Sequence, residues 1–184
     1  MIDTDRVETS EAGAWEDILR PGLAVVFVGY NPSLPAWCTG HYYANLGNRF
    51  YRLLFDAGLT PRLLTPAEDR TLPDFGIGAT DLLPVPSARA DLLPADRFRA
   101  AAPALLAKLE TLAPRAVCCN GIGVYRHLFR RPPIRLGHQP NHRLGPSALF
   151  VVPSTSGLCN GLAPARLAAF QELAAWLARA ASTG

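Results

Sequence analysis

A neutral amide follows the first strongly apolar segment of the chain. Residues 25–28 are β-branched or aromatic, which predicts a buried strand, and Gly29-Tyr30-Asn31-Pro32 then predicts a tight turn. Strands of an α/β sheet deliver such turns to the edge where ligands bind. Asn31 offers one acceptor oxygen and two donor hydrogens, and Pro32 biases it toward an extended conformation. Asn31 can therefore orient a water or a substrate without carrying charge; alternatively, it only closes the turn.

A carboxylate lies near the end of the second predicted strand, Ile77–Leu83. In a parallel sheet, Asp81 would lie at the same edge as Asn31. A carboxylate there can activate water, or it can accept a hydrogen bond from a nearby backbone N–H as a strand-end cap. A buried, unpaired acid is costly, so Asp81 needs either a use or a partner. Asp91, in a run of small and polar residues, is a second candidate.

Further segments share a content of small, polar and aromatic residues. They are residues 40–51, 76–81, 119–121 and 153–158. Together with Gly29-Tyr30-Asn31-Pro32, they resemble the mismatch-specific uracil-DNA glycosylase and thymine-DNA glycosylase family, in the family's order and over most of the chain. One Gly-x-Asn-Pro segment is weak evidence, whereas the ordered set is specific. The resemblance implies a three-layer α/β/α sandwich with a mostly parallel sheet, and an enzyme that removes uracil from DNA.

The resemblance also assigns roles to individual residues. Removing a base requires its extrusion from the duplex, after which the enzyme stabilises charge and places a water. In the family, the Asn at the position of Asn31 holds this water. The Gly29–Tyr30 segment would face the base carbonyl through the Tyr30 N–H, and Tyr43 would stack on the flipped base unless it only packs the loop. Asp81 stands where relatives carry Asn or Lys, and it could activate water or stabilise the sugar cation.

A loop after the last predicted strand is the expected DNA contact. It comprises Ser154, Thr155, Ser156, Gly157, Leu158, Cys159 and Asn160. Small hydroxyl residues allow close approach to phosphates. By resemblance, Leu158 would enter the space left by the flipped base, while the carbonyls of Gly157 and Cys159 read the guanine opposite. The alternative is that Leu158 packs back on the core. Asn160 replaces an Arg of some relatives, which would weaken the plug.

Size and periodicity predict one compact unit. The chain has 184 residues, 49% hydrophobic and 18% charged, which favours one globular domain over residues 14–184 after an acidic tail at 1–13. Helical spacing predicts helices at 15–19, 48–57, 94–112, 123–129 and 164–181, alternating with strands at 23–28, 77–83, 116–119 and 149–152. Residues 130–146 are expected to form an irregular surface excursion. With neither a transmembrane segment nor a signal peptide, we expect a cytoplasmic protein.

Cysteine and histidine positions favour neither a metal nor a disulfide framework. Cys38 and Cys159 are isolated, Cys118 and Cys119 are adjacent, and the His residues are scattered. We therefore expect no metal. The family resemblance implies a monomer without a cofactor that acts on double-stranded DNA containing uracil or a mismatch. Two alternatives are a non-catalytic nucleic-acid-binding domain, in which Asn31 is only a turn residue, and a nucleotide-binding protein. The second is disfavoured because the chain lacks both glycine-rich phosphate-binding motifs.

Charge is distributed unevenly along the chain. The first 17 residues carry six acids and one Arg, a net charge of −5, and the remainder carries 17 bases and nine acids, a net charge of +8. Lys108 is the one Lys of the chain. Arg presents a fork of donors that fits phosphate oxygens, although any single Arg can simply be a solvated surface residue. The excess favours nucleic acid as a partner.

The first prediction concerns salt. Duplex binding should weaken steeply and largely independently of sequence as salt rises from about 50 to 200 mM, because phosphate contacts release counterions. Fluorescence anisotropy of a labelled duplex at several salt concentrations measures the slope of log Kd against log salt. An affinity that stays flat over this range would contradict an electrostatic DNA-binding surface.

Overall fold

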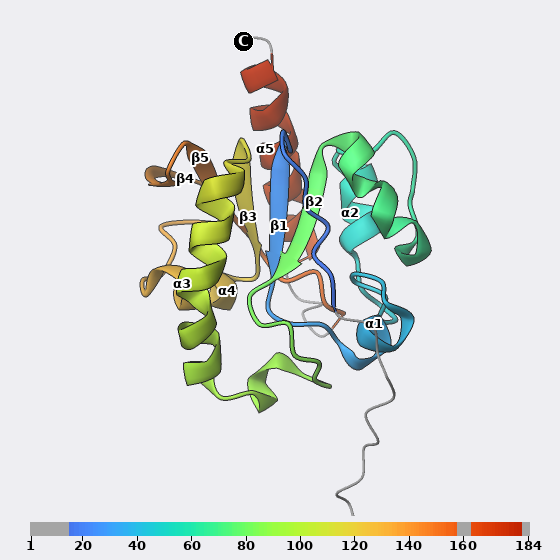
Figure 1. Ribbon diagram of the computed structural model, residues 1–184. Coiled ribbons are helices and arrows are strands. Elements are labelled where there is room, and N and C mark those ends of the chain that lie inside the picture. Colours follow the sequence, from blue (N-terminus) through green and yellow to red (C-terminus); the bar gives the residue numbers. More distant parts are fainter. Residues whose placement is uncertain (1–14, 158–162, 182–184) are drawn as a thin grey trace, which may run out of the picture.

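A five-stranded sheet forms the centre of the molecule. The computed structural model describes residues 15–157 and 163–181, so the predicted tail at residues 1–13 lies outside the described residues. The strands, in spatial order, are β2 (Ile77–Asp81), β1 (Val25–Gly29), β3 (Ala116–Asn120), β5 (Ser147–Val152) and β4 (Gly137–Leu144). All neighbours pair in parallel except β4, which runs antiparallel to β5. The predicted α/β fold with a mostly parallel sheet is confirmed (Figure 1).

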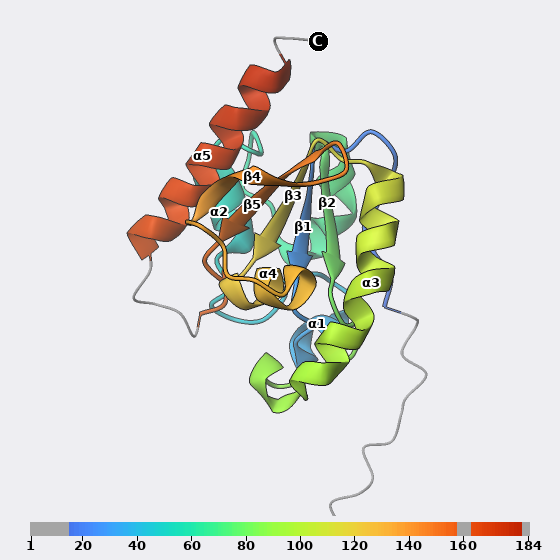
Figure 2. The same ribbon diagram turned by 90° about the vertical axis from the view of Figure 1, so that its left-hand side faces the viewer.

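Helices cover both faces of the sheet. They are α1 (Leu34–Thr39), α2 (Phe50–Asp56), α3 (Ala95–Leu112), α4 (Ile122–Phe129) and α5 (Ala163–Ala181), with 3-10 segments η1 (Pro66–Phe75) and η2 (Ala90–Leu92). In Figure 2 the sheet stands between α5 on one side and α3 on the other. The helices expected at 48–57, 94–112, 123–129 and 164–181 are confirmed within a few residues. No helix in the described part of the chain is long and apolar enough to cross a bilayer.

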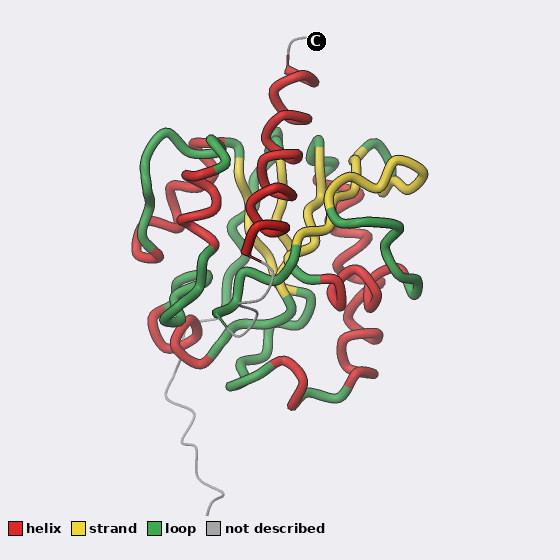
Figure 3. Tube along the Cα trace, turned by 180° about the vertical axis from the view of Figure 1, so that it is seen from behind, coloured by secondary structure: helices red, strands yellow, loops and turns green. Residues whose placement is uncertain are grey.

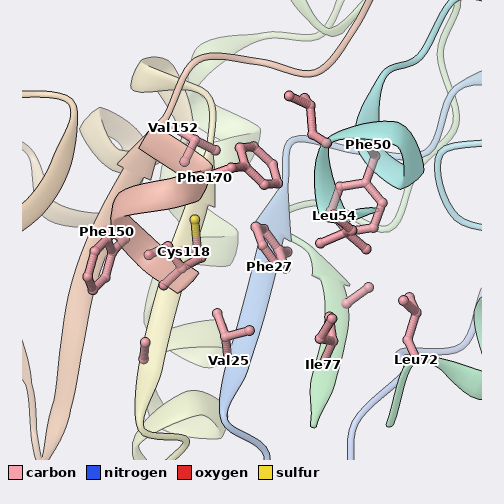
Figure 4. Packing of buried hydrophobic residues seen from close by; sticks show 14 of the residues in the cluster. Val25, Phe27, Phe50, Leu54, Leu72, Ile77, Cys118, Phe150, Val152 and Phe170 are labelled. Atoms are coloured by element: carbon pink, nitrogen blue, oxygen red, sulfur yellow. The ribbon is translucent and has the colours of Figure 1, made fainter. Parts of the chain in front are cut away.

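Alternating side chains of the strands build two cores, one on each face. Phe27 of β1 points to the face covered by α2 and α5, where its ring stacks on Phe170 with centroids 5.5 Å apart and meets Phe50 edge-on (Figure 4). Its neighbours Val26 and Val28 point to the opposite face, which α3 and α4 cover. Because both faces are buried, the central strands β1, β3 and β5 read as largely apolar runs, as expected for a parallel sheet.

Two sequence expectations about local structure are wrong. Residues 15–19 do not form a helix; Ile18 pairs with Ala79 of β2, donating and accepting backbone hydrogen bonds of 2.9 and 3.0 Å. This pairing covers an otherwise open sheet edge, which outweighs local helical spacing. Within the expected excursion at 130–146, residues 137–144 form β4. Its register shifts between His138 and Arg143, around Pro140, as an edge strand tolerates.

The strand order places a crevice beside β1. The chain passes from β1 to β2 on one side and then to β3 on the other, so the connections leave the end of β1 in opposite directions. Such switch points are where open α/β sheets bind ligands. The loops that follow these strands gather at the end of the molecule away from the C-terminus (Figures 1 and 3). A ligand site is therefore expected at this end.

Candidate active site

A cleft of about 1220 Å³ lies at the carboxyl ends of the parallel strands. Its lining includes most of the residues predicted from the sequence: Gly29, Tyr30, Asn31, Tyr43, Asp81, Ser154, Ser156 and Gly157. Residues far apart in the chain thus share one concave surface. Leu158, Cys159 and Asn160 lie outside the described residues.

The Asn31 side chain is held in one orientation. Its Nδ2 donates to the Val85 carbonyl at 2.9 Å, to Ser87 Oγ at 2.8 Å and to its neighbour's carbonyl, that of Pro32, at 3.2 Å. Two of these partners are carbonyl oxygens, which only accept, so the nitrogen and oxygen of the amide are identified by their surroundings. Within the described part of the chain, no donor bonds Oδ1. Asn31 thus presents a fixed acceptor oxygen at the cleft.

Asp81 lies directly opposite Gly29 in the pairing of β1 with β2. A Cβ atom built on Gly29 would lie 2.3 Å from Asp81 Oδ1, so any side chain at this position would collide with the carboxyl group. The other oxygen, Oδ2, accepts a hydrogen bond of 3.1 Å from Trp15 Nε1. Glycine at position 29 therefore makes room for a carboxylate that reaches over β1 into the cleft.

The surroundings of Asp81 favour its protonated form. Burial raises the pKa of this carboxyl to about 7, with a smaller rise from the charge of Asp17, while the hydrogen bond from Trp15 opposes the shift. Asp91 behaves in the opposite way, because it is exposed and its salt bridge to Arg89 lowers its pKa. Of these two carboxyls, Asp81 is therefore the one poised to exchange a proton near neutral pH.

Two tyrosines contribute differently. The Tyr30 ring covers the start of α4, where a Cβ atom on Gly123 would lie 1.4 Å from its hydroxyl, and it meets Phe98 edge-on. Tyr43 has a φ of 58° and stacks on Phe50 with centroids 3.9 Å apart. One face of the Tyr43 ring is thus covered by Phe50 of α2, and a base in the cleft would meet its edge or its other face.

The Tyr43 hydroxyl is buried deep in the cleft. Burial and the nearby Asp81 carboxylate raise its pKa, and the Asn120 amide opposes that rise without reaching hydrogen-bond geometry. Among the described residues, none completes a hydrogen bond with this hydroxyl. A buried hydroxyl without a partner costs free energy, so the site is one that a polar ligand group or a water would satisfy.

Asn120 belongs to the segment at 119–121 that carries the family resemblance, but no role of its own was predicted for it; in the structure it braces the loop after β5. Its Nδ2 donates to Thr155 Oγ1 at 2.9 Å, and its Oδ1 accepts from the Thr155 N–H at 3.0 Å. The Thr155 carbonyl in turn accepts from the Arg49 N–H at 2.9 Å. Although the Asn-Gly pair after β3 was visible in the sequence, its partner lies 35 residues away, so local pattern could not assign it this role.

The rim of the cleft combines apolar and polar groups. Leu46, in the loop between α1 and α2, is 99% exposed. Arg89 lies in the connection between β2 and α3 and also lines the cleft. Across residues 15–157 and 163–181, no group of three or more His, Cys, Asp or Glu side chains is placed to hold a metal ion. The arrangement can position a water with an amide, exchange a proton with a carboxylate, and receive a flat polar ring.

One comparison with known protein families bears on this geometry. The family model described as the uracil DNA glycosylase superfamily matches residues 16–178. The match includes all five strands, Asn31 and Asp81. It begins close to the first described residue, so the segment that pairs Ile18 with β2 belongs to the matched region as well.

The second prediction follows from the raised pKa of Asp81. Between about pH 4, where an unfolded Asp titrates, and about pH 7, the folded carboxyl keeps a proton that the unfolded chain loses, so stability should fall as pH rises through this window. Asp81→Asn removes this loss and should melt at a higher temperature than the wild type at about pH 8, with a gap that narrows toward about pH 4.

Thermal unfolding followed by circular dichroism across this pH range measures the gap. Asp91→Asn is the matched control, because the exposed Asp91 is not subject to the same burial. Equal pH dependence in the wild type and Asp81→Asn would show that burial does not raise the Asp81 pKa.

Proposed function

The chain belongs to the uracil DNA glycosylase superfamily, and on this premise we propose that it is a monofunctional glycosylase that hydrolyses the N-glycosidic bond of uracil in DNA, preferentially opposite guanine. The cleft that joins Asn31 and Asp81 carries the proposal, because it offers an oriented acceptor and a carboxyl that titrates near neutrality. A domain that only binds nucleic acid would need neither the oriented acceptor nor the titrating carboxyl.

The attacking water belongs at Asn31. Because Val85 and Ser87 hold Nδ2, the amide cannot rotate without breaking these hydrogen bonds, and Oδ1 accepts one hydrogen of a water at a defined place. An amide is too weak a base to remove the proton itself. Its contribution is orientation, which converts an encounter with solvent into an attack by a placed water.

Asp81 supplies charge and accepts the proton. As the bond between C1′ and the base breaks, its electron pair leaves with the base and the sugar becomes cationic. An ionised Asp81 stabilises that cation through space and takes the proton that water loses on bonding to C1′. With a pKa near 7, the carboxyl is ionised at slightly alkaline pH yet basic enough to accept a proton.

The remaining predicted residues would bind the base and the duplex. The base must leave the stack to reach this cleft, where Tyr43, Gly29 and Tyr30 line the wall. Contact between the Tyr30 N–H and the base carbonyl stays a prediction. Ser154, Ser156 and Gly157 line the same cleft and would approach the DNA backbone. We extend the proposal to Leu158 as the plug of the vacated space and to guanine reading by the loop, and we propose that the protein works as a cytoplasmic monomer.

The third prediction tests this function. Purified protein should release uracil from a duplex with a G:U mismatch, which alkali converts into a strand break, and more slowly from A:U or single-stranded DNA. Asn31→Ala should reduce single-turnover excision by about 10²-fold or more, as loss of a positioned catalytic group does, while anisotropy shows nearly unchanged duplex binding. Asn141→Ala, on the exposed edge strand β4, is the control. Wild-type excision by Asn31→Ala would remove Asn31 from the mechanism.

The fourth prediction concerns pH. Single-turnover excision by the wild type should rise with pH through about pH 7 as Asp81 ionises. In Asp81→Asn this acidic limb should vanish and the plateau rate should drop by about 10²-fold or more. Asp91→Asn should keep both the limb and the rate. If Asp81→Asn is folded and excises at the wild-type rate, Asp81 is a structural residue only.

A further inference from the structure

We propose that Trp15 is a positioning residue for the Asp81 carboxylate, fixing the direction of its free oxygen and favouring its ionised form. The inference rests on the proposed function for its catalytic meaning, but the contact itself is testable without any activity. Trp15 comes from the segment before β1 and lies 66 residues from Asp81 in sequence. No sequence motif connects the two residues.

The indole of Trp15 is itself held in place. Its ring lies 4.6 Å from the ring of Tyr42 and is stacked at 6.0 Å on Trp37, centroid to centroid. Three residues further, Ile18 joins the edge of β2 through its two backbone hydrogen bonds with Ala79. Ring packing and strand pairing therefore aim the Trp15 N–H at Asp81 before any substrate arrives.

This contact decides which oxygen serves the cleft. Trp15 Nε1 donates a hydrogen bond of 3.1 Å to Asp81 Oδ2. The other oxygen, Oδ1, lies over the Cα of Gly29 and near the Tyr43 hydroxyl. A carboxyl anchored at one oxygen cannot turn about its last bond without losing the hydrogen bond. The anchored oxygen thus fixes the direction in which Oδ1 can accept a proton.

Trp15 also counteracts the other groups around Asp81. Burial and the charge of Asp17 raise the Asp81 pKa, and the Trp15 hydrogen bond lowers it. From the neighbouring loop, Tyr42 and Tyr43 are neutral groups whose own pKa values are raised by burial and, to a smaller extent, by the Asp81 charge. Within the described part of the chain, no Arg, Lys or His forms a salt bridge with Asp81; the nearby Lys108 pairs with Asp17 instead, at 2.7 Å. A neutral N–H is thus the group that favours the anion.

The first test measures the Asp81 pKa directly. In protein labelled with ¹³C at Asp carboxyls, Trp15→Phe keeps an aromatic ring in the stack but removes the donor, so the Asp81 titration should move up by about 0.5–1 pH unit, the scale of the net contribution of one ordinary hydrogen bond. Trp37→Phe removes an indole from the same stack without touching Asp81 and should leave the titration unchanged. Asp17→Asn removes the negative neighbour and should move it down.

A second measurement follows the wild-type chain and does not require Trp15→Phe to fold. The Trp15 indole ¹H–¹⁵N resonance, identified by its loss in Trp15→Phe or by elimination with Trp37→Phe and Trp176→Phe, should shift with pH at the midpoint of the Asp81 carboxyl. An indole resonance that ignores this titration, or equal Asp81 midpoints in Trp15→Phe and Trp37→Phe, would overturn the proposal.

Excision kinetics then connect the contact to catalysis. Below the midpoint, Trp15→Phe should lose about 3–10-fold in single-turnover rate, matching the shifted ionisation, and the loss should shrink at alkaline pH. A purely structural role would lower the rate equally at every pH and would contradict the proposal. If the wild type excises no uracil at all, the proposed function fails, while the two titrations still decide whether Trp15 sets the state of Asp81.

Discussion

Burying one carboxyl group at the end of β2 constrains much of the surrounding structure. Asp81 is only 8% exposed and has no cation beside it among the described residues, so its ionised form is disfavoured by the loss of water. Space for it exists only because residue 29 is a glycine. The segment before β1 must also reach across the edge of the sheet to supply a donor. Burial of this carboxyl lowers the stability of the folded chain at neutral and alkaline pH, and in return the group titrates near neutral pH. Such a loss of stability is common at functional sites.

The elements of the fold that depend on local pattern were predictable. Apolar runs identified β1, β3 and β5, a segment bounded by Ile77 and Leu83 was recognised as the strand that contains β2, and a parallel sheet then placed Asn31 and Asp81 at one edge. Elements that depend on pairing with distant segments were not predictable. The segment at residues 15–19 has helical spacing, yet an open strand edge draws it into an extended pairing. Strand β4 contains Pro140 and few apolar residues, and only its position at the sheet edge makes it a strand.

The same division holds for the site. Asn31 was recognisable because its turn is encoded by four consecutive residues. Its anchors, Val85 and Ser87, lie 54 and 56 residues away, and the bracing pair of Asn120 and Thr155 is separated by 35. The residue types in a sequence indicate which side chains can do chemistry, but they do not indicate which neutral groups orient those side chains. These orienting groups are polar residues of ordinary types, and only the tertiary structure distinguishes them from solvated ones.

The loops on the rim of the cleft are joined backbone to backbone. A Cβ atom built on Gly157 would lie 3.0 Å from the Gly47 carbonyl oxygen. In the same pair of loops, the Thr155 carbonyl accepts a hydrogen bond from the Arg49 N–H. No side chain separates the two loops at this point, so there is no flexible spacer to absorb a relative displacement. We therefore expect the two loops to be displaced together, so that a load on the loop bearing Ser156 also shifts the segment that follows Tyr43.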